Sequence, residues 1–248
     1  MKNALLLLFA PLLFIGCSKD ARFELPDDPL EVVQTTPEVY ALGAQKQVFK
    51  VRIETLAEGD FVTPFAPGVW VVQKKNSAPI FTDGAPDYGD GLEAIAEDGA
   101  PGMLYDALIH HPKVREHGIF NTPVGAAEPA PIFPGEAYEF TFTAKPNDCL
   151  NFTTMFIQSN DLFVAPAPEG LSLFDENDDP ISGDITPYLY LWDAGTEVNE
   201  EPGVGPNQAP RQSGPNTGPD ENGVVQRVDD GYMYPALNEV IRVTVIPL

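Results

Sequence analysis

Acidic residues follow two of the apolar segments of this 248-residue sequence. Asp161 comes shortly after a segment that ends at Ile157, and Asp193 and Glu197 come just after one that ends at Trp192. Loops at one end of a β-sandwich can converge, so these three carboxylates could supply hard oxygen ligands to one Ca²⁺ ion. The alternative is that the acids only keep the surface soluble.

A second acidic stretch, residues 91–99 (GLEAIAEDG), lies between two glycines. If the stretch is helical, Glu93 and Glu97 share a face, and paired carboxylates could do acid and base chemistry. We favour a capped helix with a solvated acidic face, because nothing in the sequence fixes the distance between the two carboxylates.

A third acidic stretch, residues 175–179 (DENDD), begins like a calcium-binding loop with oxygen ligands at alternate positions. It then departs from the EF-hand pattern, since Pro180 stands at the position of the glycine and Thr186 at that of the bidentate glutamate. The stretch therefore predicts a tight turn between two strands.

The strands that would position these acids are visible in the spacing of apolar residues. Phe49, Val51 and Ile53 alternate with charged residues, which is the period of a half-buried strand. Other strand candidates alternate in the same way or are rich in aromatic and β-branched residues: 69–72, 138–143, 150–157, 188–192 and 241–245. Helical patterns are limited to one or two turns, at residues 92–96 and 103–110. The sequence therefore predicts an all-β sandwich or barrel over residues 47–248.

One long segment, residues 199–223, contains five prolines, five glycines and hardly any large apolar residue. Such a composition cannot bury enough apolar area to offset the entropy of ordering. We expect an irregular surface excursion that is held only by contacts at its two ends.

The N-terminus carries Lys2, an apolar run over residues 4–15, and then Gly16 and Cys17. This order is typical of a signal peptide, and the cysteine after the glycine resembles the bacterial lipobox, in which that cysteine is acylated. Residues 1–16 are thus predicted to be a lipoprotein signal peptide, Cys17 the lipidated residue, and residues 17–46 a polar tether. The expected location is the bacterial cell envelope outside the cytoplasm, at the outer membrane or the cell surface.

The formal net charge of the chain is −23. A surface this acidic repels phosphate backbones and anionic lipids, which excludes nucleic acid as a partner. Contact with a membrane would therefore depend on the acyl anchor. Cys149 is the one cysteine besides Cys17, so no disulfide can form once Cys17 is acylated, and we expect Cys149 to be a buried small side chain.

Four motifs in this order resemble the spondin N-terminal domain family: residues 63–70 (TPFAPGVW), 91–99 (GLEAIAEDG), 160–164 (NDLFV) and 193–197 (DAGTE). The resemblance implies an antiparallel β-sandwich similar to a C2 domain, with a Ca²⁺ ion between the loops that carry Asp161, Asp193 and Glu197. The sequence departs from the family at Leu162, where a tryptophan is common, at Glu197, where aspartate is frequent, and in lacking the disulfides of the animal members.

Three functions are open at this point. The first is an envelope-anchored, calcium-binding adhesion or binding module, with a protein or glycan ligand and no enzymatic activity. The second is a carbohydrate or ester hydrolase that uses carboxylates such as Glu93, Glu97 and Asp98. The third is a structural envelope lipoprotein without a ligand.

Overall fold

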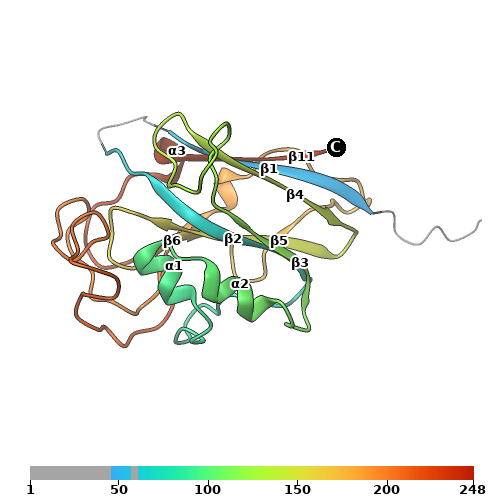
Figure 1. Ribbon diagram of the computed structural model, residues 1–248. Coiled ribbons are helices and arrows are strands. Elements are labelled where there is room, and N and C mark those ends of the chain that lie inside the picture. The colour runs from blue at the N-terminus through green and yellow to red at the C-terminus, as the bar shows by residue number, and fades with distance from the viewer. Residues whose placement is uncertain (1–45, 57–60) are drawn as a thin grey trace, which may run out of the picture. The chain divides into compact units, whose positions relative to one another are not determined.

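The computed structural model describes residues 46–56 and 61–248, and shows an antiparallel β-sandwich (Figure 1). The smaller sheet has the order β4-β1-β11-β8, formed by Ala137–Ala144, Gln47–Thr55, Ile241–Pro247 and Gly183–Asp184. The larger sheet has the order β10-β9-β6-β5-β2-β3, formed by Gln226–Arg227, Tyr190–Asp193, Leu162–Ala165, Asp148–Phe156, Phe65–Lys74 and Val114–Phe120. A short strand, β7 (Leu171–Ser172), also pairs with β5.

The main core lies between the two sheets. On β1 the alternation seen in the sequence puts Phe49, Val51 and Ile53 inside, each fully buried. They meet side chains of the larger sheet such as Trp70 and Phe152 in one apolar cluster. The sandwich and the strand at the start of the domain are therefore as the sequence predicts.

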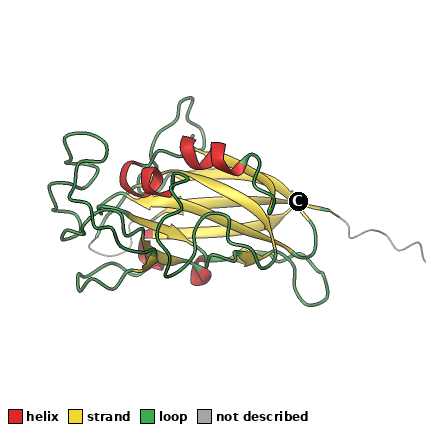
Figure 2. Ribbon diagram, turned by 90° about the horizontal axis from the view of Figure 1, so that it is seen from below, coloured by secondary structure: helices red, strands yellow, loops and turns green. Residues whose placement is uncertain are grey.

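The larger sheet is covered on its other face as well. Helices α1 (Leu92–Asp98) and α2 (Gly102–Leu108) pack on that face, away from the smaller sheet (Figures 1 and 2). Every residue of β5 is buried for this reason, and Cys149 is among them, as expected. The remaining helical turns are η1 (Thr186–Tyr188) and α3 (Leu237–Val240). The predicted short helices are confirmed within a few residues.

Helix α1 differs from its prediction in one respect. It begins after Gly91 and ends before Gly99, whose left-handed backbone lets the N–H of Ala100 donate to the Ala94 carbonyl at 2.9 Å. The acidic face is not simply solvated, however, because the Glu97 side chain is only 4% exposed.

The acidic stretch at residues 175–179 is a turn, as predicted. The Asp175 carboxylate accepts hydrogen bonds from the backbone N–H groups of Asn177 and Asp179, and an isolated bridge pairs Phe174 with Pro180. The carboxylate thus caps its own turn.

The predicted signal peptide, Cys17 and all but the last residue of the tether lie outside the described residues. Within the described part of the chain, no helix has the length and apolar character needed to cross a membrane.

Candidate metal centre

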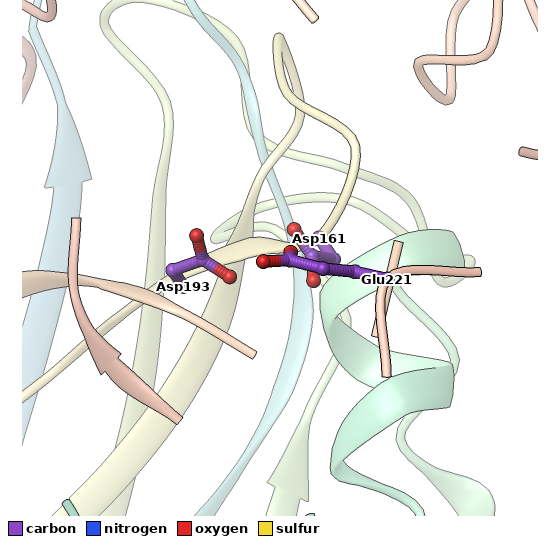
Figure 3. Close-up of side chains that lie close together, drawn as sticks. All are labelled: Asp161, Asp193 and Glu221. Carbon is purple, nitrogen blue, oxygen red and sulfur yellow. The ribbon is translucent and has the colours of Figure 1, made fainter. Parts of the chain in front are cut away.

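Three carboxylates meet at one end of the sandwich. One oxygen each of Asp161, Asp193 and Glu221 lie within 4.8 Å of one another (Figure 3). Asp161 and Asp193 are buried, and Glu221 is exposed. We call this set the acidic cluster. The structure thus brings together two of the three residues singled out from the sequence and adds a third from a distant segment.

The larger sheet positions the two aspartates. Asp161 is the last residue of the tight turn that joins β5 to β6, and Asp193 is the last residue of β9. Leu162, which directly follows Asp161, is paired with Asp193 across β6 and β9. The two acids therefore lie at the same end of these neighbouring strands. The Ala194 N–H donates to the Asp161 carbonyl at 3.2 Å, which fixes the loop after β9 against the turn.

Glu221 arrives because the far end of residues 199–223 returns beside the loop after β9. The Glu221 N–H donates to the Thr196 carbonyl at 2.9 Å, and the Gly223 N–H donates to the Gly195 carbonyl at 2.7 Å. These backbone bonds form a short antiparallel contact next to the acids. A side chain that is 60 residues after Asp161 in the chain therefore reaches the cluster.

The Asp161 carboxylate has one satisfied and one unsatisfied oxygen. Its Oδ2 accepts hydrogen bonds from the Thr196 N–H, the Thr196 hydroxyl and the Glu197 N–H, at 2.8, 3.2 and 3.1 Å. Its Oδ1 is buried and has no hydrogen-bond partner among the described residues. Since the residue is 0% exposed, this oxygen loses its hydration without a hydrogen bond in return, which is costly. A bound cation would remove that cost.

Asp193 is held in a similar manner. Its Oδ1 accepts from the Gly195 N–H at 2.7 Å, and its Oδ2 accepts from the Asn199 amide at 2.7 Å. All of these donors are neutral, so they orient the carboxylate without cancelling its charge. The Asn199 side-chain oxygen is itself buried, and no described residue gives it a hydrogen bond.

The pKa values of both aspartates reflect this crowding. Burial, followed by the charge of Asp193, raises the pKa of Asp161 above its usual value. Burial is also the main cause of the raised pKa of Asp193, and the charges of Glu221 and Asp230 add to it. A divalent cation would favour the ionised form of carboxyl groups whose ionisation is opposed in this way by burial and neighbouring charge.

Glu197 contacts the acidic cluster through its backbone N–H group. Its N–H binds Asp161, but its carboxylate is not part of the acidic cluster. Glu197 is 3% exposed, and its carboxylate packs against Gly218, where a Cβ atom would collide with it. Its Oε1 has no hydrogen-bond partner in the part of the chain that the structure describes. The sequence offered one clue to Glu221: the pair Asp220 and Glu221 at the end of a stretch that has no other acidic residue after Glu201.

The acids considered for hydrolysis lie close together along α1. Glu93, Glu97 and Asp98 line one cavity of about 180 Å³. Asp98 accepts a hydrogen bond from Gln212, and Glu93 accepts one from Asn216. Burial raises the pKa of Glu97 to about 7, while a hydrogen bond with the Thr196 side chain opposes the shift. These carboxylates therefore attach residues 196–216 to the helix.

The middle of residues 199–223 is fixed as well, so our expectation of contacts only at its ends was wrong. Gln208 is fully buried, and its amide donates to the carbonyls of Glu200 and Glu201. Arg211 reaches Gln158 on the loop after β5. The segment contains no helix or strand, as expected, but side-chain hydrogen bonds anchor it along its length.

No protein-family model matches the chain, and a search of curated proteins found no match. The resemblance to spondin N-terminal domains, with the C2-like topology that it implies, stays a prediction.

Proposed function

We propose that the chain is an envelope-anchored binding module whose ligand-binding loops are organised by a Ca²⁺ ion at the acidic cluster. The observation that carries this proposal is Asp161, a fully buried carboxylate with one oxygen free beside two further carboxylates. Calcium prefers carboxylate, carbonyl and water oxygens, and takes six to eight of them. Asp161, Asp193 and Glu221 supply the charged ligands, and water or nearby carbonyls complete the set.

Electrostatics support a cation at this position. Three carboxylates within 4.8 Å repel one another, and the hydrogen bonds to the two aspartates come from neutral groups. A divalent ion offsets the repulsion and links the turn after β5, the end of β9 and residues 219–223. It would therefore stabilise the loops at this end of the sandwich.

Thermal and urea unfolding with calcium and with chelator tests the site. Binding only to the folded form should raise the free energy of unfolding by about 2.7 kcal/mol when free calcium is a hundred times its dissociation constant. Equal stability in calcium and in chelator, at the same ionic strength, would contradict the proposal and favour a structural protein without a ligand.

Four variants separate the ligands from their neighbours. Asp193→Asn and Glu221→Gln should each lose most of the calcium-induced gain, because each removes a charged ligand. Asp178→Ala, in the turn at residues 175–179, is the control and should keep the gain. Glu197→Gln should keep most of it. A gain lost in Glu197→Gln and kept in Glu221→Gln would instead support the ligand set implied by the spondin resemblance.

The anchor is the second part of the proposal, and it rests on Cys17 in the sequence. Cys17→Ala should abolish labelling by a fatty-acid probe in a bacterial host. Labelling of the variant as strong as that of the parent would mean that the protein has no lipid at this residue.

The hydrolase alternative has less support. Asp98, Glu93 and Glu97 each hold a hydrogen bond from the loop segment at residues 196–216, which is sufficient reason for acids at these positions. We therefore do not assign them a catalytic role, and we propose that the chain is not an enzyme.

A further inference from the structure

A pocket opens directly onto the acidic cluster. It has a volume of about 340 Å³, at the lower end of the range of about 300–1,000 Å³ that is usual for small-ligand sites. Asp193 and Glu221 form part of its wall, whereas Asp161 is closed off behind them at 0% exposure. An ion held by the three carboxylates would therefore have protein on the Asp161 side and the pocket on the other.

We propose that this pocket binds one neutral sugar residue through two neighbouring hydroxyl groups, which would complete the coordination of the ion. The inference rests on the proposed calcium site. Calcium takes six to eight oxygens, so three carboxylates leave positions for ligands that enter from the pocket. A hydroxyl suits such a position, because its oxygen can face the ion while its O–H donates to a nearby acceptor.

The remaining wall of the pocket includes two further carboxylates. These belong to Asp229 and Asp230, and the side chains of Val198, Asn199 and Gln226 also line the pocket. A ligand for this wall must bring several O–H donors and no negative charge, since the carboxylates would repel an anion. Neutral sugars meet both conditions. An amine would meet them too, but it would compete with the ion for the same carboxylates.

Tyr232 supplies an apolar surface beside these acceptors. Its side chain is 41% exposed and lines the pocket, and its backbone N–H donates to Asp230 Oδ1 at 2.9 Å, which fixes its position. An exposed aromatic ring offers contact area at little entropic cost, and the C–H face of a pyranose is a suitable partner for it.

Calorimetry on the full chain tests the proposal in two stages. Calcium is titrated first, and then D-mannose, D-galactose or D-glucose is added to the calcium-loaded protein. At least one of these sugars should bind, and its affinity should fall about tenfold or more in chelator, because the ion is a charged contact. D-Glucuronate, which differs from glucose by a carboxylate, should bind more weakly than glucose. Butylamine, a simple amine, tests whether an amine binds to the carboxylates in place of the calcium ion.

Two variants of the pocket and one control complete the test. Tyr232→Ala and Asp229→Asn should weaken the sugar about tenfold while calcium still binds, since neither residue belongs to the acidic cluster. Asp178→Ala should leave both affinities unchanged.

The outcomes are distinguishable. Calcium binding without binding of any of the three sugars overturns the sugar proposal and leaves the proposed calcium site intact. Sugar binding that is equal in chelator, or that survives both pocket variants, also overturns it, and so does butylamine that displaces calcium. Absence of calcium binding contradicts the proposed function itself, and the sugar proposal with it.

Discussion

The sandwich and residues 199–223 are held in place by different interactions. In the sandwich, large side chains such as Phe49 and Phe152 are fully buried between two sheets. In residues 199–223, Gln208 is the one residue with a large side chain that is fully buried. Its side-chain amide is fixed by hydrogen bonds to backbone carbonyls. The comparison shows that a segment without an apolar core can still be positioned well enough to deliver a ligand such as Glu221, provided that its polar groups are paired.

The largest expected effect belongs to the sandwich. Phe49 stacks on Phe142 with ring centroids 5.7 Å apart and meets the edge of Phe174 at 5.5 Å. Phe49→Ala should lower the free energy of unfolding by about 3–5 kcal/mol, because it leaves a cavity in a packed core. Urea unfolding measures the loss. The calcium-induced gain should remain that of the parent, since the ring is not part of the acidic cluster. A lost calcium gain would mean that the two regions are coupled.

An intermediate effect is expected from Gln208. Gln208→Ala should lower the free energy of unfolding by about 1–3 kcal/mol, the cost of leaving buried hydrogen-bonding groups unpaired. Because the same segment carries Glu221, calcium affinity should fall as well. Ser213→Ala, at an exposed position in the same segment, is the matched control and should stay within about 0.5 kcal/mol of the parent. A Gln208 variant with unchanged stability and calcium affinity would show that the segment is positioned by its ends alone.

The same contrast explains what the sequence could predict. Strand β1 followed from the spacing of apolar residues, because burial of one face of a strand imposes a period of two. The burial of Cys149 followed from its place in an apolar run. Asp161 and Asp193 followed from their position at the ends of apolar strands. Glu221 did not, since it is placed by backbone hydrogen bonds between residues 195–198 and 219–223, and such bonds can form with almost any side chains.

The burial of Glu97 was missed for a related reason: the loop that covers it comes from far along the chain. Thr196 lies about a hundred residues later, and its contact with the helix depends on the whole course of the larger sheet. A local pattern of acids on a helix indicates solvent exposure unless a distant segment returns to cover it, and periodicity carries no information about that return.

The smallest expected effect is a change in the pH dependence of stability. Its measurement tests whether residues 196–216 cover helix α1. The folded-state pKa of Glu97 is raised from 4.5 to about 7, mainly by burial, so the folded chain holds this proton more tightly than the unfolded chain. In chelator, the contribution of Glu97 to stability should therefore be present below about pH 4.5 and be lost as the pH rises towards 7.

Glu97→Gln removes the titrating group, so its melting temperature should fall less than that of the parent between pH 5 and pH 7.5. We expect a difference of about 1 kcal/mol, or about 2–4 °C, because Glu97 also lines the cavity beside α1, where solvent screens part of the cost of its ionisation. Melts at both pH values, with Glu93→Gln as the control for a more exposed acid on the same helix, measure it. Parallel curves for the parent and Glu97→Gln would mean that Glu97 faces solvent, and that residues 196–216 do not cover the helix in solution.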